Sequence, residues 1–255
     1  MQEIKLSAPD WCFYRKEFNP EEYYGKLREI GYAAVEMAPP EHWEALRNAG
    51  LKLLNIGAPG METGLNNQDN HSSLIPEILN TIILASENGI PHVIIFSGNR
   101  RGIADSAGLE NCKSAIEKLL PVAQNKNVTL IFEMFNGFDH QDYQADNSKF
   151  GFDLVEAFNS ANLKILYDIY HMHRMGENVI SDITSNLKHI AHLHVAGAPK
   201  RNFPDDFQEI DYPAITAAVM KAGYKGCWGM EFITPAPIEE LEQAVALWKK
   251  ICTFE

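Results

Sequence analysis

The chain is poor in cysteine and lacks any long apolar run. Its 255 residues include 4 cysteines, which lie far apart and form no C-x-x-C pair. This spacing argues against a disulfide framework and against a thiolate zinc site. No segment approaches the ~20 consecutive apolar residues of a membrane-spanning helix. The N-terminus also lacks the basic stretch and apolar core of a secretory signal. We therefore expect a cytoplasmic protein that does not bind membranes.

Basic side chains are scarce as well. The chain has 22 Lys and Arg residues against 34 Asp and Glu residues, which gives a formal net charge of -12. Such a charge repels the phosphate backbone of nucleic acids, so nucleic acid is not an expected partner. Hydrophobic residues make up 45% of the chain, which is enough for a substantial core.

Eight short β-rich runs alternate with longer helical patterns, and no linker or low-complexity segment interrupts them. The runs cover residues 3–8, 33–38, 51–57, 92–98, 128–135, 163–170, 190–197 and 227–234, and a last helical pattern covers 239–251. Several helical patterns open on a capping residue and close on glycine. Eight such units in about 250 residues are typical of a (β/α)8 TIM barrel. We predict an α/β fold of this kind, with residues 1–255 forming a single domain.

One carboxylate stands inside an apolar run in the segment TLIFEMFNG, residues 129–137. Alternation along a strand places Leu130, Phe132 and Met134 on one face and Glu133 on the other. The apolar side chains would meet the helices, so Glu133 would face the barrel axis near the carboxyl end of its strand. Active sites of TIM barrels are built at that end.

The next three predicted strands also end in potential metal ligands, namely Asp168, His194 and Glu231. Gathering three carboxylates without compensation costs several kcal/mol per ion, against a total stability of ~5–15 kcal/mol. A divalent cation would offset this repulsion. The donor set favours Mn²⁺, Mg²⁺ or Co²⁺, and Zn²⁺ is also compatible. Alternatively, any one of these acids could cap a helix or pair with a lysine.

Six further segments carry a family resemblance: GYAAVEM, NIGAPG, EMFN, YDIYH, HLHVAGAPKR and GYKGCWGMEF. They resemble the xylose-isomerase-like sugar isomerase and epimerase barrels, most closely the hydroxypyruvate isomerase branch. The resemblance implies that Glu133, Asp168, His194 and Glu231 bind one divalent metal ion. It also implies that the two glutamates serve as the catalytic acid and base, and that such barrels often form homo-oligomers.

The same resemblance implies substrate contacts. His171 and Arg201 would hold substrate oxygens, and Asp139 lies six positions after Glu133, where the epimerases place a glutamate that contacts the substrate. His194 is more similar to the ketose 3-epimerases, because the bacterial hydroxypyruvate isomerases carry glutamine at that position. The substrate is therefore expected to be a small carbohydrate or a hydroxy-keto acid.

These residues predict a metal-dependent isomerase or epimerase of a small α-hydroxy carbonyl compound. A divalent metal would stabilise the enediolate, and Glu133 and Glu231 would transfer the proton. Spacing does not show which glutamate is the base, or whether the product is an isomer or an epimer. Alternative functions are a metal-dependent dehydratase of the keto-inositol type, an endonuclease IV-like metal nuclease and a non-catalytic sugar-binding module.

Three more polar residues have two interpretations each. Glu36 closes the second predicted strand and would either point into the barrel or make a structural hydrogen bond. His192 shares a face with His194 and is interpreted as a hydrogen-bonded core histidine rather than a fifth ligand. We assign His173 to loop structure.

Two other groups are less specific. Arg100 and Arg101 could receive a carboxylate or phosphate, although a solvated loop is the simpler interpretation. Trp11, Phe13 and Tyr14 could line an apolar side of a pocket, or they could pack in a lid or at a dimer interface.

Overall fold

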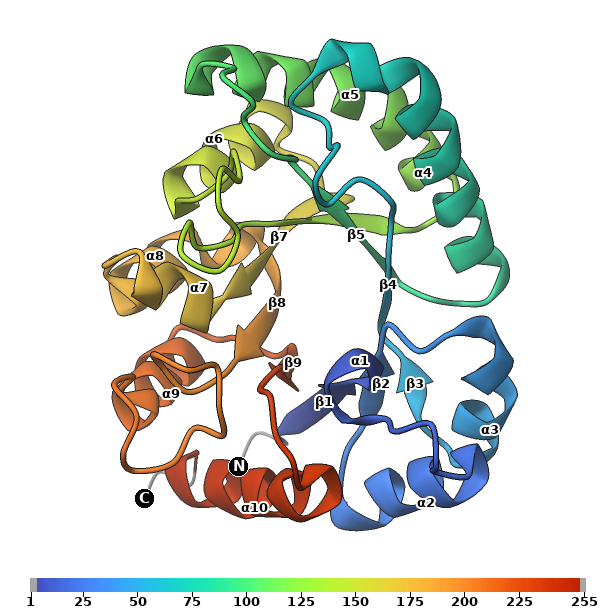
Figure 1. Ribbon diagram of the computed structural model, residues 1–255, viewed down its shortest axis with the longest axis vertical. Coiled ribbons are helices and arrows are strands. Elements are labelled where there is room, and N and C mark those ends of the chain that lie inside the picture. Colours follow the sequence, from blue (N-terminus) through green and yellow to red (C-terminus); the bar gives the residue numbers. More distant parts are fainter. Residues whose placement is uncertain (1–3, 253–255) are drawn as a thin grey trace. The chain divides into compact units, whose positions relative to one another are not determined.

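A computed structural model of the chain describes residues 4–252 (Figure 1). Glu3, the first residue of the predicted strand 3–8, therefore lies outside the described residues. Both ends of the predicted domain 1–255 also lie outside them. The chain divides into two compact units, which we call the terminal unit and the central unit. The terminal unit comprises Met1–Leu54, Asn178–Leu187 and His192–Glu255, and the central unit comprises Asn55–Glu177 and Lys188–Ala191.

The terminal unit contains a parallel sheet in the order β3-β2-β1-β9-β8. Its strands are β1 (Lys5–Pro9), β2 (Ala34–Glu36), β3 (Lys52–Leu53), β8 (Ile190–Val195, of which residues 192–195 belong to this unit) and β9 (Cys227–Met230). Because the strands are parallel, their carboxyl ends lie at the same edge of this sheet.

The helices of the terminal unit are α1 (Asp10–Phe13), α2 (Pro20–Ile30), the 3-10 helix η1 (Pro40–His42), α3 (Trp43–Asn48), α8 (Val179–Asn186), α9 (Tyr212–Lys221) and α10 (Pro237–Ile251). Local sequence sets their ends, as α2 illustrates. The Asn19 side chain accepts a hydrogen bond from the Glu22 backbone N–H, and Pro20 supplies the fixed φ angle of the first turn. Gly31 closes the helix in the left-handed conformation, at φ 114°.

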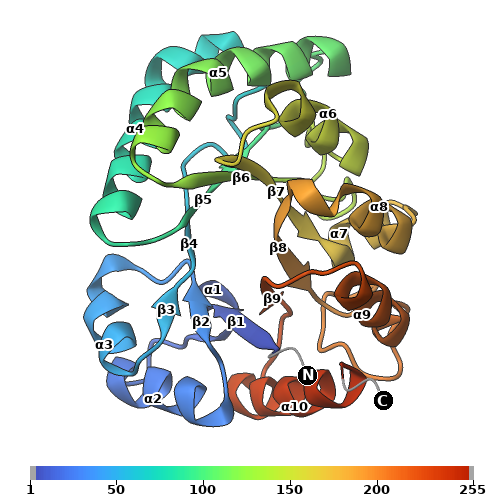
Figure 2. The ribbon, with the colours of Figure 1, turned by 180° about the vertical axis from the view of Figure 1, so that it is seen from behind.

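The central unit contains a second run of parallel strands, in the order β4-β5-β6-β7. These strands are β4 (Asn55–Gly57), β5 (His92–Phe96), β6 (Thr129–Glu133) and β7 (Leu163–Asp168). The helices are the 3-10 helix η2 (Gln68–Asn70), α4 (His71–Glu87), α5 (Asp105–Asn125), α6 (Ser148–Phe158) and α7 (Ile169–Arg174). A 3-10 helix, η3 (Leu187–His189), precedes β8. Figure 2 shows α4 and α5 side by side along the outer side of these strands.

Packing against α6 confirms the predicted alternation along β6. The Phe132 and Phe150 rings stack with centroids 6.1 Å apart, and Gly151 leaves room for the Met134 side chain. Both contacts place the apolar face of the strand against α6. Glu133 lies between Phe132 and Met134 in sequence and therefore points to the opposite face, as predicted.

Every predicted strand overlaps an observed one, although the bounds differ throughout, and three of the differences are informative. The run 51–57 forms two strands, β3 and β4, which lie on either side of Leu54, where the two units divide. The run 163–170 was predicted too long, because residues 169–170 already belong to α7. The run 227–234 was also too long, because β9 ends at Met230 and Glu231 follows it. Among the described residues, no helix combines the length and the apolar character needed to cross a membrane.

Candidate active site

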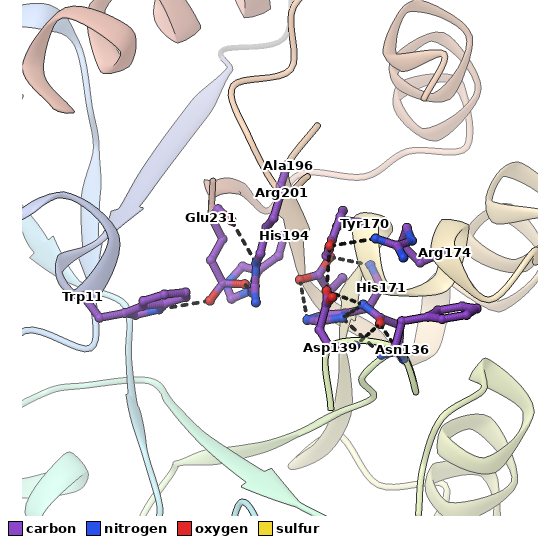
Figure 3. Close-up of polar contacts among 12 residues, drawn as sticks. Trp11, Asn136, Asp139, Tyr170, His171, Arg174, His194, Ala196, Arg201 and Glu231 are labelled. Atoms are coloured by element: carbon purple, nitrogen blue, oxygen red, sulfur yellow. Dashed lines mark hydrogen bonds and ion pairs between the residues drawn. The ribbon is translucent and has the colours of Figure 1, made fainter. Parts of the chain in front are cut away.

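Glu231 is the centre of the polar contacts in the terminal unit (Figure 3). It is 4% exposed and directly follows β9. Its Oε2 atom lies 2.6 Å from Nη2 of Arg201 and 2.9 Å from Nδ1 of His194. Its Oε1 atom accepts a hydrogen bond of 3.1 Å from the indole N–H of Trp11. The Arg201 guanidinium in turn lies over the Trp11 ring, 5.2 Å from its centroid.

A second buried carboxylate, Glu36 at the end of β2, holds the other side of His194. Its Oε2 atom is 2.9 Å from Nε2 of His194, and its Oε1 atom is 3.0 Å from Nε2 of His192. Ser7 in β1 donates a third hydrogen bond, of 2.7 Å, to Oε1. Burial tends to raise the pKa of the Glu36 carboxyl, but the two imidazoles beside it hold that pKa well below its usual range. Glu36 is therefore a buried carboxylate anion.

Gly229 in β9 makes room for this network. A Cβ atom at this position would lie 2.5 Å from Oε1 of Glu36, 2.7 Å from Cδ2 of His194 and 2.8 Å from Nε2 of His192. Such distances are well inside van der Waals contact, so a side chain here would displace at least one of the three groups. The absence of a side chain at Gly229, in the segment CWGME, thus has a steric explanation that does not depend on its backbone conformation.

The residues of the terminal unit fit a metal ion in two ways. Ligand atoms of Glu36, His192 and His194 all lie within 4.8 Å of one another, so this buried cluster could itself hold an ion. However, both imidazoles already share hydrogen bonds with Glu36 through Nε2. The other pair of donors is Nδ1 of His194 and Oε2 of Glu231, which are 2.9 Å apart. Adjacent ligands of an octahedral ion, each about 2.1 Å from it, are roughly 3.0 Å apart, so this pair has the spacing of two cis ligands.

A separate polar cluster restrains α1, the short helix that carries Trp11. Asp10, the first residue of α1, is 4% exposed, and its Oδ2 atom accepts a hydrogen bond of 2.5 Å from the Tyr24 hydroxyl. Nδ1 of His42 lies 3.4 Å from the same oxygen. Burial raises the pKa of Asp10 to about 6, and the contacts with Tyr24 and His42 oppose that rise.

Two candidate ligands belong to the central unit, on adjacent strands. Glu133 is the last residue of β6, pairs in register with Leu166 of β7, and is 5% exposed. Asp168 is the last residue of β7 and is 1% exposed. Its Oδ1 atom accepts a hydrogen bond of 3.1 Å from the His171 backbone N–H, which makes Asp168 the N-cap of α7.

The predicted substrate contacts His171 and Asp139 share one network in the central unit (Figure 3). Nδ1 of His171 accepts from the Asn136 backbone N–H at 3.1 Å and lies 2.6 Å from Nδ2 of Asn136. Asp139 Oδ2 accepts from Asn136 Nδ2 at 2.9 Å and from the Tyr170 hydroxyl at 2.6 Å. Since Nδ1 of His171 is an acceptor, the ring proton is on Nε2 in the neutral imidazole, 3.6 Å from Asp168 Oδ2. Asn136 and Tyr170 were not singled out as functional from sequence, although Asn136 lies three residues after the end of β6, in the segment EMFN.

The structure settles several secondary interpretations. Glu36 makes a structural hydrogen-bond network, and the buried His192 is a hydrogen-bonded core histidine, as expected. His173 does not lie in a loop but in α7. Arg100 forms ion pairs with Asp105 and Asp146, at 3.0 and 2.9 Å, so its guanidinium already has carboxylate partners within the protein.

The three aromatic residues after β1 have different environments. Trp11 is 49% exposed and bonds to Glu231. Phe13 is buried against Phe232, with ring centroids 4.9 Å apart. Tyr14 donates to the Phe18 carbonyl and packs among other aromatic rings. Trp11 alone of the three contacts a candidate catalytic residue in the part of the chain that is described.

Curated relatives of this chain are named as isomerases. A hydroxypyruvate isomerase of Escherichia coli K12 is 30% identical over 124 residues, which are 49% of this chain but 46% of that protein. A putative hydroxypyruvate isomerase of Mus musculus is 27% identical over 254 residues, covering 91% of this chain and 90% of that protein. A 2-oxo-tetronate isomerase of Cupriavidus necator is 28% identical and covers 51% of each chain. This chain thus spans about half the length of two of these relatives and nearly all of the third.

Solved structures establish the fold. An AP endonuclease of family 2 from Brucella melitensis gives a TM-score of 0.81 at 18% identity and covers 97% of this chain and 99% of its own. D-psicose 3-epimerase from Clostridium cellulolyticum H10, solved with D-tagatose, gives 0.81 at 16% identity and covers 98% and 100%. The IOLI protein, solved with a bound zinc atom, gives 0.74 at 18% identity and covers 97% and 96%.

These likenesses confirm the predicted α/β barrel of parallel strands surrounded by helices. That residues 1–255 form one domain stays a prediction. The family model described as "Xylose isomerase-like TIM barrel" matches residues 25–251, which is most of the sequence. The chain therefore belongs to the xylose isomerase-like TIM barrel family.

Proposed function

We propose that this protein is a divalent-metal-dependent isomerase of a small α-hydroxy carbonyl compound, with a 2-oxo acid of the hydroxypyruvate type as the substrate. The observation that carries the proposal is the environment of Glu231. One of its oxygens contacts both a histidine nitrogen with the spacing of a cis metal ligand and an arginine that can receive a substrate carboxylate. The names of the curated relatives support the same class of reaction.

The metal would be held by Glu133, Asp168, His194 and Glu231. In a TIM barrel the carboxyl ends of the strands form one rim, and each of these residues lies at the carboxyl end of a strand or one position from it. Three carboxylates and one imidazole suit Mn²⁺, Mg²⁺ or Co²⁺, and Zn²⁺ is compatible. When bound, the ion would polarise the carbonyl and the adjacent hydroxyl of the substrate.

Glu133 and Glu231 would transfer the proton. Isomerisation of hydroxypyruvate removes a proton from C3 and returns one to C2, while the hydroxyl proton moves from O3 to O2, so no redox partner is required. Both oxygens of Glu231 accept from donors, Trp11 and Arg201, as an ionised carboxylate does, and the ionised carboxylate is the form that can take a proton. Which glutamate takes the proton first is left open by the proposal.

Three residues would orient the substrate. Arg201 lies over the Trp11 ring and already pairs with Glu231 through Nη2, so a substrate carboxylate would share the guanidinium with that glutamate. His171, with Nδ1 occupied by Asn136, would donate from Nε2 to a substrate oxygen. Asp139, fixed by Asn136 and Tyr170, would accept from a substrate hydroxyl.

Proton NMR in D₂O tests the proposal directly. The Mg²⁺-loaded protein and an EDTA-treated sample are each mixed with hydroxypyruvate, 2-oxo-tetronate, fructose, tagatose, psicose or xylulose, beside blanks without protein. We expect metal-dependent formation of 2-hydroxy-3-oxopropanoate from hydroxypyruvate, with deuterium incorporated at C2, and slower reaction or none with the neutral ketoses. Turnover of a ketose but not of either oxo acid would contradict the substrate class. Equal turnover in the EDTA-treated sample would contradict the metal-dependent mechanism.

A further inference from the structure

We propose that Glu36 is a positioning residue that fixes the tautomer of His194, so that Nδ1 is the atom offered to the metal ion. This inference rests on the proposed function, because it concerns the affinity of the same metal site. The contacts that support it all lie within the terminal unit.

The hydrogen bonds determine where the ring proton lies. A carboxylate is an acceptor only, so the nitrogen 2.9 Å from Glu36 Oε2 must donate, and Nε2 of His194 carries the proton. In the neutral imidazole Nδ1 then has the lone pair, and it is the nitrogen that lies 2.9 Å from Oε2 of Glu231. In this tautomer Nδ1 and the Glu231 oxygen are two acceptors 2.9 Å apart, which suits two ligands of one cation. The opposite tautomer would instead place two acceptors against each other at Glu36 and an N–H at the proposed ligand position.

Glu36 is itself held in place for this task. It is fully buried, and Ser7 and His192 donate to the oxygen that does not contact His194. Each of these two bonds restrains the carboxylate, and both leave Oε2 for His194. Metal-bound histidines commonly donate their second ring nitrogen to a carboxylate, and loss of such a partner costs about 10–100-fold in metal affinity.

The packing around Gly229 supports a requirement for this geometry. A β-carbon there would strike Glu36, His192 and His194 at once. The strand therefore leaves a side-chain-sized space that is filled by the carboxylate and its two imidazole donors. A core built only for apolar packing would have no need of three buried polar groups at this point.

The test compares the variants Glu36→Gln and Ser7→Ala with the unmodified protein. The amide of Glu36→Gln has one acceptor oxygen, so it cannot accept from both imidazoles as the carboxylate does. Ser7→Ala removes a hydrogen bond from the same carboxylate but leaves the contact with His194, and it serves as the matched control. Affinity is measured by calorimetric titration of the chelator-treated proteins with Co²⁺. Circular dichroism checks that both variants are folded.

We expect Glu36→Gln to lose about 10–100-fold in Co²⁺ affinity, and Ser7→Ala to stay within about threefold of the unmodified protein. Equal affinity in Glu36→Gln, or an equal loss in Ser7→Ala, would overturn the inference while leaving the metal-dependent function intact. An unmodified protein that binds no Co²⁺, Mn²⁺ or Mg²⁺ would overturn the function and the inference together.

A second measurement is made on the unmodified protein and uses a variant only to assign the signals. Nitrogen-15 NMR of the histidine side chains in the Mg²⁺-loaded, unmodified protein reports which ring nitrogen is protonated, and loss of its signals in His194→Asn assigns His194. We expect the proton on Nε2. A proton on Nδ1 would overturn the proposed role of Glu36 whatever the affinity data show.

Discussion

Replacement of Gly229 by alanine should destabilise the protein through the Glu36 network. The added Cβ atom would lie 2.5 to 2.8 Å from Glu36, His194 and His192, whereas carbon atoms pack favourably at about 3.5–4.0 Å. Relief of the clash requires movement of β9 or of one of these side chains, because none of them is the mobile end of an exposed chain.

The size of the effect follows from two contributions. Overpacking in a well-packed core costs about 1–3 kcal/mol. Losing one hydrogen bond from an imidazole to the buried carboxylate adds about 1.5–3 kcal/mol. Together we expect a loss of about 2.5–6 kcal/mol in the free energy of unfolding. For a chain of this size, such a loss lowers the melting temperature by roughly 5–25 °C.

Thermal unfolding of the metal-free protein, followed by circular dichroism, measures this loss. Gly25→Ala is the matched control, because Gly25 lies within α2 and a Cβ atom there meets nothing within 4 Å. The control should gain about 0.5–1 kcal/mol, since glycine is unfavourable in a helix interior. A Gly229→Ala variant that melts with the unmodified protein would refute the steric argument.

Three further predictions concern chemistry, substrate choice and pH. Glu133→Gln and Glu231→Gln should each abolish isomerisation while the circular dichroism spectrum is unchanged, and near-normal turnover in both would contradict the assigned proton transfer. Arg201→Lys should raise KM for hydroxypyruvate roughly 10–100-fold, since it loses a charged hydrogen bond, with little change for an uncharged ketose; equal losses for both substrates would exclude a carboxylate contact. The folded-state pKa of Asp10, about 6, exceeds its ordinary value of 3.8, so its contribution is complete below pH 3.8 and is lost as the pH rises through 6. Asp10→Asn should therefore remove about 3 kcal/mol of pH dependence between pH 4 and 7, and an unchanged profile of melting temperature against pH would show that Asp10 does not titrate in this way.

Much of the fold could be predicted because its signals are local. Alternation within residues 129–134 predicted which face of β6 meets a helix, and the Phe132–Phe150 contact confirms it. Capping residues such as Asn19 and Gly31 set the ends of α2 from within a few positions. The boundaries that were wrong depend on subtler features. Asp168 acts both as a strand end and as the cap of α7, so the strand ends two residues before the predicted end.

The candidate site shows a sharper division. Sequence alone predicted that Glu133, Asp168, His194 and Glu231 stand at or next to the ends of four consecutive strands, because alternation of strand and helix patterns is a local signal. Only the tertiary structure decided what holds His194 and Glu231. Glu36 and His194 are 158 positions apart, and Trp11 and Glu231 are 220 apart, so no local pattern links them. These long-range hydrogen bonds exist because strands β1, β2, β8 and β9 pair as neighbours, and that pairing sets the tautomer of His194 and the partners of Glu231.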